Sequence, residues 1–510
     1  MTASRTRMKR QKGIAIMLTG VLLVLIIPVV GLAIDASVLY AMKARLSASA
    51  DAAAIAAARS LSVGLTMAEQ EESARERAED FFAANFPENS WSTKAHSVSV
   101  DVAETAYRTR TVLVTAQLTA PQYFMRMLGY ESTTVKAVGK ASRRDVNLVI
   151  VLDRSYSMRD DVAPGNPCST MKSAAANFVN MFAEGRDRLA LITYGSSWFL
   201  GMAPTMNFKT ASPSLASRIG TISCDGNTST AMAMWQAYQQ LDVIDEPGTL
   251  NLMVVFTDGW PNGITGDLVV KRKTDTRYGY GADGYSSTTS TYSMLPSTCT
   301  DAEGDKYDRN AGSSSATYSA PGWNPNWTPA NRTGVIAQWS SPTASKGDTA
   351  GPMKLYATSI SSSSEVEIDA KAGCRFDANL KYLRRDIAYI PDTDIYGNST
   401  SGYKTVSTFS SGDYAGKKRI DSPSAITYAS MNLTDNTAAR IRSDDALKPV
   451  IYAIGLGDVE HELLRRISND PTSPIYDSTR PAGLYVYAPT PTELNYAFTR
   501  IASEILRIAQ

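Results

Sequence analysis

The fold of this chain is decided by the stretch Val146-Asn147-Leu148-Val149-Ile150-Val151-Leu152-Asp153-Arg154-Ser155-Tyr156-Ser157. Its apolar first half has the length and composition of a buried strand. One carboxylate and two hydroxyls follow the strand directly, on Asp153, Ser155 and Ser157. Oxygens at every second residue can converge on a small hard cation such as Mg²⁺, which prefers oxygen ligands and keeps some of its waters. The stretch therefore predicts a strand that ends in part of a metal site.

Two later segments can supply the remaining oxygens. A second apolar run, Leu250–Phe256, leads into Thr257-Asp258-Gly259, in which Asp258 is a second acid. Between the two strands, the segment 225–230 opens an amphipathic helix and carries the hydroxyl of Thr228. Because ligand sites of open α/β sheets gather at the carboxyl ends of the strands, we expect these side chains to meet at one edge.

Together the three segments resemble the metal-ion-dependent adhesion site of von Willebrand factor type A domains, whose pattern is D-x-S-x-S, then a loop Thr, then T-D-G. The matching positions are Asp153, Ser155, Ser157, Thr228 and Asp258. The resemblance implies a doubly wound α/β fold with a mostly parallel sheet. It also implies that the serines and often the threonine bind Mg²⁺ (or Mn²⁺ or Ca²⁺) directly, that the acids act largely through water, and that a partner carboxylate completes the shell.

Two alternatives to this site stay open. Thr230 could take the place of Thr228, although Thr228 has the spacing to Ala233 and Met234 that is usual in the resembled family. The fold could also keep all of these oxygens for hydrogen bonds to one another, because Ser and Asp also build turns and cap helices.

The amino-terminal region predicts a membrane anchor. A cluster of basic residues in the tail 1–13 precedes an uncharged apolar run, Ile14–Ile34, which matches the ~20 residues that cross a bilayer. The basic cluster lies upstream and the first acid, Asp35, lies downstream, so the amino terminus is expected in the cytoplasm and the remainder outside it. A cleaved signal peptide is the alternative, but the apolar run exceeds the usual core of such peptides.

The anchor and the residues after it carry a second resemblance. The segments Gly31-Leu32-Ala33-Ile34-Asp35, Leu39-Tyr40 and Ala50–Ala54 are similar to the amino-terminal region of TadG-like Flp (tight adherence) pilus assembly proteins. Such proteins commonly carry a von Willebrand A domain behind the anchor. The resemblance implies a single-pass protein of the bacterial inner membrane with its carboxyl-terminal domain in the periplasm. Pseudopilin relatives are cleaved at a Gly followed five residues later by Glu. Gly13 is followed by Ile14-Ala15-Ile16-Met17-Leu18, which contains no Glu, so we expect the anchor to stay attached.

Three further regions follow the transmembrane segment 14–34. The Ala-rich sequence after it favours helix and predicts a helical stalk over 35–89. Alternating apolar and polar residues at Ser97–Val102 and Thr111–Ala116 predict a small β-containing spacer over 90–143. The von Willebrand A domain then occupies 144–510.

A large insertion interrupts the predicted metal domain at about 265–420. The next core strand after Asp258 begins only at Val450, whereas a strand-helix-strand unit needs ~30 residues or a little more. Three tryptophans of the insertion, Trp323, Trp327 and Trp339, need burial or a partner, and packing in a core is the favoured interpretation. Because the insertion leaves the fold near Asp258, it could also cover the metal.

The four cysteines fit an oxidising compartment, where structural bridges persist. Cys168 follows the first metal loop and Cys224 precedes Thr228 by a few residues, so we expect both at one end of the sheet and joined to each other. That pairing leaves Cys299 to join Cys374. Zinc binding by all four is the alternative, although no Cys-x-x-Cys spacing supports it.

Charge and motif content bear on the function. A net charge of +1 gives no electrostatic reason to expect nucleic acid, so the predicted partners are proteins. The two histidines, His96 and His461, are not placed beside the site by the sequence, and Walker and G-x-S-x-G motifs are absent. We therefore predict no enzyme, with metal-activated water chemistry as the alternative.

Two functions remain. The favoured one is a metal-dependent adhesion or docking module that binds an acidic side chain of a pilus subunit, secretion component or surface ligand. The alternative is a structural periplasmic anchor of the pilus machinery whose metal only stabilises the fold.

Overall fold

The computed structural model describes residues 12–87, 93–246, 249–269, 331–337, 354–356, 358–360, 389–412, 414–420 and 422–508. The chain forms two compact units that divide between Arg144 and Asp145. Several features predicted from the sequence lie outside the described residues, namely most of the basic tail, the cysteines Cys299 and Cys374, and the tryptophans Trp323, Trp327 and Trp339.

The first unit is built on one long helix, α1 (Lys12–Ser60), which contains both the apolar run and the Ala-rich segment. Its large apolar side chains from Met17 to Leu32 are exposed, whereas one face is buried from Met42 onward. The helix is long and apolar enough to cross a membrane, a test that a signal sequence near the amino terminus also passes. A second helix, α2 (Met67–Asn85), begins at a capping box formed by Thr66 and Glu69.

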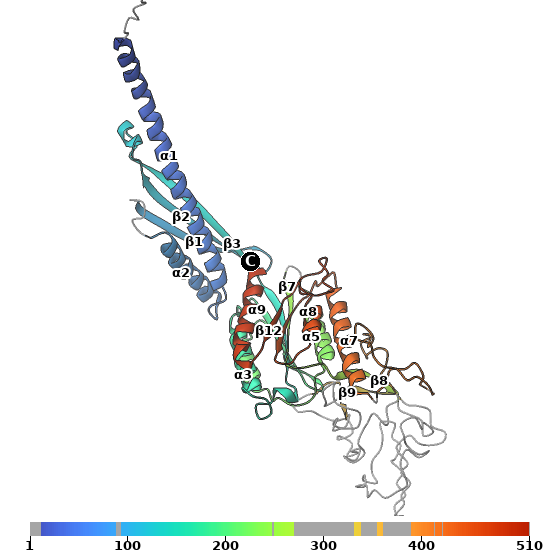
Figure 1. Ribbon diagram of the computed structural model, residues 1–510. Helices are drawn as coiled ribbons and strands as arrows, with labels where there is room; N and C mark the ends of the chain where they lie inside the picture. The colour runs from blue at the N-terminus through green and yellow to red at the C-terminus, as the bar shows by residue number, and fades with distance from the viewer. Residues whose placement is uncertain are drawn as a thin grey trace, which may run out of the picture. The chain divides into compact units, whose positions relative to one another are not determined.

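The second half of α1 packs with α2 against a three-stranded antiparallel sheet of β1 (Lys94–Ala106), β2 (Thr109–Pro121) and β3 (Ser132–Arg144) (Figure 1). Gly139 allows the close approach of helix and strand, since a Cβ there would lie 2.2 Å from the carbonyl oxygen of Ala50. The two helices and the sheet share one core that includes Leu46, Ala54, Phe82, Val112, Val114 and Leu118. The stretches predicted as a stalk and as a spacer are therefore parts of one packed unit.

The second unit contains a six-stranded sheet in the order β12-β11-β7-β4-β5-β6. Its strands are β4 (Val146–Asp153), β5 (Arg188–Tyr194), β6 (Trp198–Thr205), β7 (Leu250–Thr257), β11 (Val450–Leu456) and β12 (Tyr485–Ala488). All neighbouring pairs are parallel except β5 with the edge strand β6. The four central strands β4, β5, β7 and β11 are buried along nearly their whole length, which explains why they appear in the sequence as largely apolar runs.

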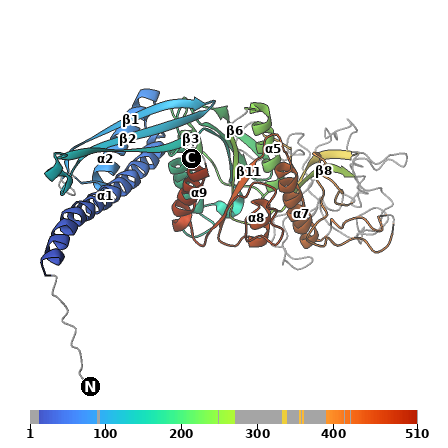
Figure 2. The same cartoon turned by 90° about the horizontal axis from the view of Figure 1, so that it is seen from above.

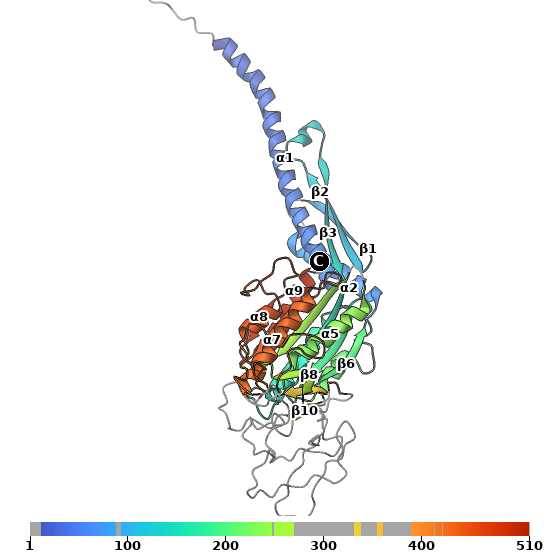
Figure 3. The same cartoon turned by 90° about the vertical axis from the view of Figure 1, so that its right-hand side faces the viewer.

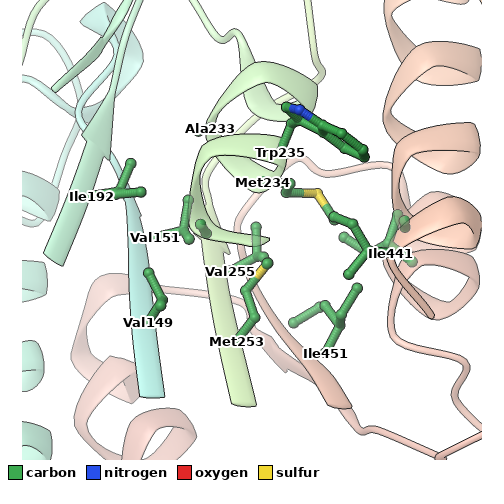
Figure 4. Close-up of a cluster of buried hydrophobic side chains, with 14 of the residues drawn as sticks. Val149, Val151, Ile192, Ala233, Met234, Trp235, Met253, Val255, Ile441 and Ile451 are labelled. Carbon is green, nitrogen blue, oxygen red and sulfur yellow. The ribbon is translucent and has the colours of Figure 1, made fainter. Parts of the chain in front are cut away.

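Helices cover both faces of this sheet (Figure 2). On one face lie α5 (Thr230–Ile244), α7 (Pro423–Arg442) and α8 (His461–Ile467), which pack on alternate strand residues such as Val149, Val151 and Met253 (Figure 4). On the other face lie α3 (Pro167–Asn180) and α9 (Leu494–Ile508), where the ring of Phe498 lies 5.5 Å from Phe178 and 6.0 Å from Phe256 of β7. The predicted doubly wound α/β fold is confirmed.

Part of the described insertion forms a second, smaller sheet together with the residues just before it. Its antiparallel strands are β8 (Gly263–Val269), β9 (Asn331–Ala337) and β10 (Lys354–Tyr356), in the order β10-β9-β8. Ile264 and Ile336 of this sheet pack on Ile426 and Leu433 of α7 in a separate apolar core. A short helix, α4 (Leu215–Gly220), lies between β6 and α5 in the sequence.

Candidate metal site

The strand register places the candidate residues at one edge of the six-stranded sheet. In the parallel ladders, Asp153 of β4 pairs with Tyr194 of β5, and Leu152 pairs with Phe256 of β7. The carboxyl ends of these three strands therefore lie at the same level. The loops after β4 and β7 leave this edge together, as expected for a ligand site in an open α/β sheet.

Asp153 is buried and held in one orientation through both of its carboxylate oxygens. The backbone N–H of Ser155 donates to Oδ1 at 2.9 Å, and the hydroxyl of Thr257 donates to Oδ2 at 2.7 Å. Burial raises the pKa of Asp153 above its ordinary value, because a charge is costly in a site that excludes water.

Two serine hydroxyls meet the second acid. The Oγ atoms of Ser155 and Ser157 lie 3.0 Å apart, and they donate to Oδ1 of Asp258 at 3.2 and 3.0 Å respectively. Ser155 is buried, Asp258 is half-buried and Ser157 is exposed, so the cluster opens to solvent on the side of Ser157. The two loops thus bring three of the predicted oxygen-bearing side chains into direct contact.

The two acids of the site are electrostatically unfavourable as a pair. Burial, and then the nearby charge of Asp153, raise the pKa of Asp258 to about 8. Hydrogen bonds from Ser155 and Ser157 favour the charged form, but they offset only part of this effect. A divalent cation at this position would supply the positive charge that favours two ionised carboxylates.

Thr228 lies in a buried loop that is tied to both of the other loops. Its N–H donates to Oδ1 of Asn262 at 2.8 Å, and the N–H of Asn262 donates back to its carbonyl at 3.0 Å. On the other side, the N–H of Tyr156 donates to the carbonyl of Gly226 at 2.9 Å. The backbone around Thr228 is therefore held against the loops that carry Ser155 and Asp258.

Thr230, the alternative to Thr228, has a different environment. It is the first residue of α5, and its hydroxyl lies 3.5 Å from the hydroxyl of Tyr194. The Tyr194 hydroxyl donates to the carbonyl of Phe256 at 3.1 Å. The Thr230 hydroxyl is thus in contact with the Tyr194 side chain of β5. The choice of Thr228 as the ligand stays a prediction.

Comparison with known families adds to this geometry. Residues 148–260, which span β4 to the Asp258 loop, match the von Willebrand factor type A domain family. The chain carries a von Willebrand factor type A domain. Residues 13–60, which correspond to α1, match the family described as putative Flp pilus-assembly TadE/G-like. No curated protein resembles the chain closely enough to count as a match.

Several solved structures of pilus proteins are similar to the chain at low identity. The PilB minor pilin from Streptococcus sanguinis is 12% identical over 82% of this chain and 80% of its own, with a TM-score of 0.33. The pilus adhesin SpaC from Lactobacillus rhamnosus GG is 13% identical over 81% and 35%, with a TM-score of 0.35. The vWF domain of the type V pili tip protein Mfa5 from Porphyromonas gingivalis is 14% identical over 72% and 98%, with a TM-score of 0.35. Likeness at these scores decides nothing about function.

A disulfide braces the von Willebrand A domain next to the candidate site. Cys168 in the first turn of α3 is joined to Cys224, with 6.3 Å between their Cα atoms. The residue after Cys224, Asp225, donates its N–H to the carbonyl of Arg154 at 2.6 Å. This pairing was predicted from the sequence and is confirmed, whereas the pair Cys299 and Cys374 lies outside the described residues.

Some residues that shape the site were not singled out in the sequence. Thr257 orients Asp153, Tyr194 supports the strand ends and Asn262 holds Thr228. Only Thr257 had a signal, as the first residue of the T-D-G match. Among the residues that the structure describes, three or more His, Cys, Asp or Glu side chains never cluster as a metal site, so the candidate centre depends on hydroxyls beside two acids.

Proposed function

We propose that this chain is a membrane-anchored docking protein of Flp/Tad-type pilus assembly and adherence, which binds a protein partner through a divalent cation. Mg²⁺ is the first candidate, with Mn²⁺ or Ca²⁺ as substitutes. The ligand set is Asp153, Ser155, Ser157, Thr228 and Asp258. The observation that carries the proposal is the contact of Ser155 and Ser157 with Asp258 at 3.2 and 3.0 Å, at the carboxyl edge of the sheet.

The donor set fits a hard cation. Hydroxyl and carboxylate oxygens are the ligands that Mg²⁺ takes in proteins, usually with waters completing the shell. Asp153 already accepts hydrogen bonds at both oxygens, which suits an acid that acts through metal-bound water. The exposure of Ser157 leaves one side of the cluster accessible, and a carboxylate of the partner protein can complete the shell there.

The amino-terminal helix supports a membrane location for the docking domain. The apolar part of α1 would cross the bacterial inner membrane once, with the basic tail in the cytoplasm and the von Willebrand A domain in the periplasm. The TadE/G-like match over residues 13–60 supports a place in pilus assembly. The predicted partner is a pilus or secretion component, or a surface ligand, with an exposed Asp or Glu.

A structural anchor is the second candidate. The hydroxyls of Ser155 and Ser157 satisfy each other and Asp258 by hydrogen bonds alone, so the loops can hold their conformation without a ligand from a partner. In that case a bound cation would stabilise the fold and take no part in recognition.

Crosslinking in cells separates the two functions. Full-length protein is crosslinked in living cells in Mg²⁺ or in a chelator, and captured proteins are identified. Ser157→Ala removes an exposed hydroxyl of the site, and Ser173→Ala removes an exposed hydroxyl of α3 as a matched control. Docking predicts that capture is lost in chelator and in Ser157→Ala and kept in Ser173→Ala. Capture that survives chelation while the melting temperature falls supports the structural anchor.

A further inference from the structure

The loop between β2 and β3, residues 122–131, carries a concentration of exposed apolar and aromatic side chains. Met127 is 84% exposed and Tyr130 is 64% exposed. Tyr123 and Phe124 are 47% and 40% exposed, and Arg126 of the same loop is exposed as well. Clusters of large apolar side chains on a protein surface mark interaction sites. A partner for this loop has to accept aromatic and aliphatic groups together with one positive and one negative charge, those of Arg126 and Glu131.

The loop is fixed to α1. Asp35 is only 2% exposed, and its carboxylate accepts backbone hydrogen bonds from Tyr123, Phe124 and Met125 at 3.0, 3.0 and 2.8 Å. One turn earlier, Gly31 lies against the side chain of Phe124, and a Cβ added at Gly31 would come within 2.8 Å of the Cβ atom of Phe124. The loop is therefore held at the helix position where the apolar run ends.

The contacts along α1 show at which end of the three-stranded sheet the β2–β3 loop lies. From the amino-terminal side, Gly31 meets Phe124, the Lys43 ammonium donates to the carbonyl of Lys136, and Ala50 meets Gly139. At the far end of α1, the Arg110 guanidinium donates to the carbonyl of Leu61 at 3.2 Å. The β2–β3 loop is thus the part of the sheet nearest the apolar segment, which continues past it in Figures 1 and 3.

The opposite end of the same sheet provides an internal comparison. Tyr107, in the turn between β1 and β2, is 61% exposed. It is separated from the β2–β3 loop by the length of β2 (Thr109–Pro121), which at about 3.3 Å per residue is roughly 40 Å. If the apolar run of α1 crosses a bilayer, the β2–β3 loop is at the level of the lipid headgroups and Tyr107 is well outside them.

We propose that the β2–β3 loop is a second membrane contact, which inserts Met127 and Tyr130 into the interfacial layer of the bilayer beside α1. The proposal rests on the crossing of the membrane by α1 that is part of the proposed function. Tyrosine is enriched at membrane interfaces because its ring is apolar and its hydroxyl is wet, and a neighbouring arginine such as Arg126 can reach lipid phosphates. Because the hydrogen bonds of Asp35 fix the loop to α1, this contact sets the depth of α1 in the bilayer and restrains its tilt.

Depth-dependent fluorescence quenching tests the proposal. Full-length Met127→Cys protein is labelled with an environment-sensitive fluorophore and reconstituted into nanodiscs of phosphatidylcholine and phosphatidylglycerol that contain lipids spin-labelled at shallow or deep acyl positions. Tyr107→Cys is the matched control at the other end of the sheet, and Val24→Cys reports on the apolar segment itself. The protein without an added cysteine is labelled in the same way, and its fluorescence gives the background from label on the native cysteines. The expected result is quenching of Met127 by shallow labels, of Val24 by deep labels, and of Tyr107 by neither.

Each outcome has a distinct meaning. Quenching at Val24 without quenching at Met127 overturns the loop contact and leaves the anchor intact, whereas no quenching at Val24 overturns both. Quenching at Met127 that requires added membrane proteins assigns the loop to a protein partner and also overturns the proposal. In an Asp35→Asn background the three N–H groups lose a charged acceptor, so quenching at Met127 should fall several-fold while quenching at Val24 is unchanged. Equal quenching at Met127 with Asp35 and with Asp35→Asn would show that the Asp35 carboxylate does not hold the loop in the membrane.

Discussion

Thr257 donates a hydrogen bond of 2.7 Å to Oδ2 of Asp153, and so joins the end of β7 to the end of β4 beneath the candidate metal site. Replacing Thr257 by Val keeps the shape of the side chain but leaves a buried carboxylate oxygen without this donor. We expect the free energy of unfolding to fall by about 1–3 kcal/mol. Affinity for Mg²⁺ or Mn²⁺ should fall as well, because Asp153 loses its fixed orientation. Denaturant unfolding and calorimetric titration measure the two effects.

A conservative variant controls for packing at this position. Thr257→Ser keeps the hydroxyl and should retain most of the metal affinity, whereas Thr257→Val should not. Equal metal binding by the two variants would show that the hydrogen bond to Asp153 plays no part in the site.

Metal affinity should depend on pH through Asp258, whose pKa is raised to about 8 without metal. Below that pH a proton must leave before the cation binds, so the affinity should fall by up to about tenfold for each pH unit. Titrations with Mn²⁺ at several pH values between 6 and 9 measure the slope. Affinity that is constant over this range would contradict the proposed role of Asp258.

The same shift gives a prediction for stability without metal. The pKa of Asp258 is about 8 in the folded protein, above its ordinary value of 3.8. Between about pH 4 and pH 8 the folded protein therefore keeps a proton on Asp258 that the unfolded chain has already released. The contribution of Asp258 to the free energy of unfolding therefore decreases as the pH rises through this window. The increase in melting temperature caused by Mg²⁺ should accordingly be larger at pH 8 than at pH 5.

Loss of the bridge between Cys168 and Cys224 should loosen the loop that leads to Thr228. A double Cys→Ser variant is expected to lose about 2–5 kcal/mol of stability if it behaves like bridges of small secreted domains. Non-reducing peptide mapping of exported protein should recover this pair, and the same map tests the predicted pair of Cys299 and Cys374. Free thiols at Cys168 and Cys224 would refute the bridge.

A single membrane crossing predicts where the carboxyl terminus lies. A reporter that is active only after export should be active when fused after Gln510. The basis is the basic cluster before Ile14 and the absence of charge up to Ile34. Activity of a reporter that works only in the cytoplasm would reverse the assigned orientation.

The sequence predicted those parts of the fold whose pattern is local. The strands β4, β7 and β11 are buried on both faces and appear as largely apolar runs, and the motif residues follow two of them directly. The edge strand β6 alternates less clearly because it is only partly buried, and it was not predicted. The shared core of α1 and the first sheet depends on contacts between distant residues such as Ala50 and Gly139, which no local pattern reveals.

In the candidate site, too, residues that are close in sequence could be predicted, whereas contacts between distant residues could not. Asp153, Ser155 and Ser157 were recognisable because they are close in sequence and follow a strand. The roles of Tyr194 and Asn262 arise from strand pairing and loop contacts across the fold, so spacing along the chain gave no indication of them.

Direct titration of the protein with Mn²⁺, followed by electron paramagnetic resonance, tests the central claim that these loops hold a divalent cation. Wild-type full-length protein in detergent should bind one Mn²⁺ that Mg²⁺ displaces, and Asp153→Ala should abolish binding. Thr228→Ala should weaken binding more than Thr230→Ala, because Thr230 is engaged with Tyr194. Ser157→Ala should weaken it with only a small loss of stability, since Ser157 is exposed but donates a hydrogen bond to Asp258. Equal Mn²⁺ affinity in the wild type, Asp153→Ala and Ser157→Ala would contradict the account.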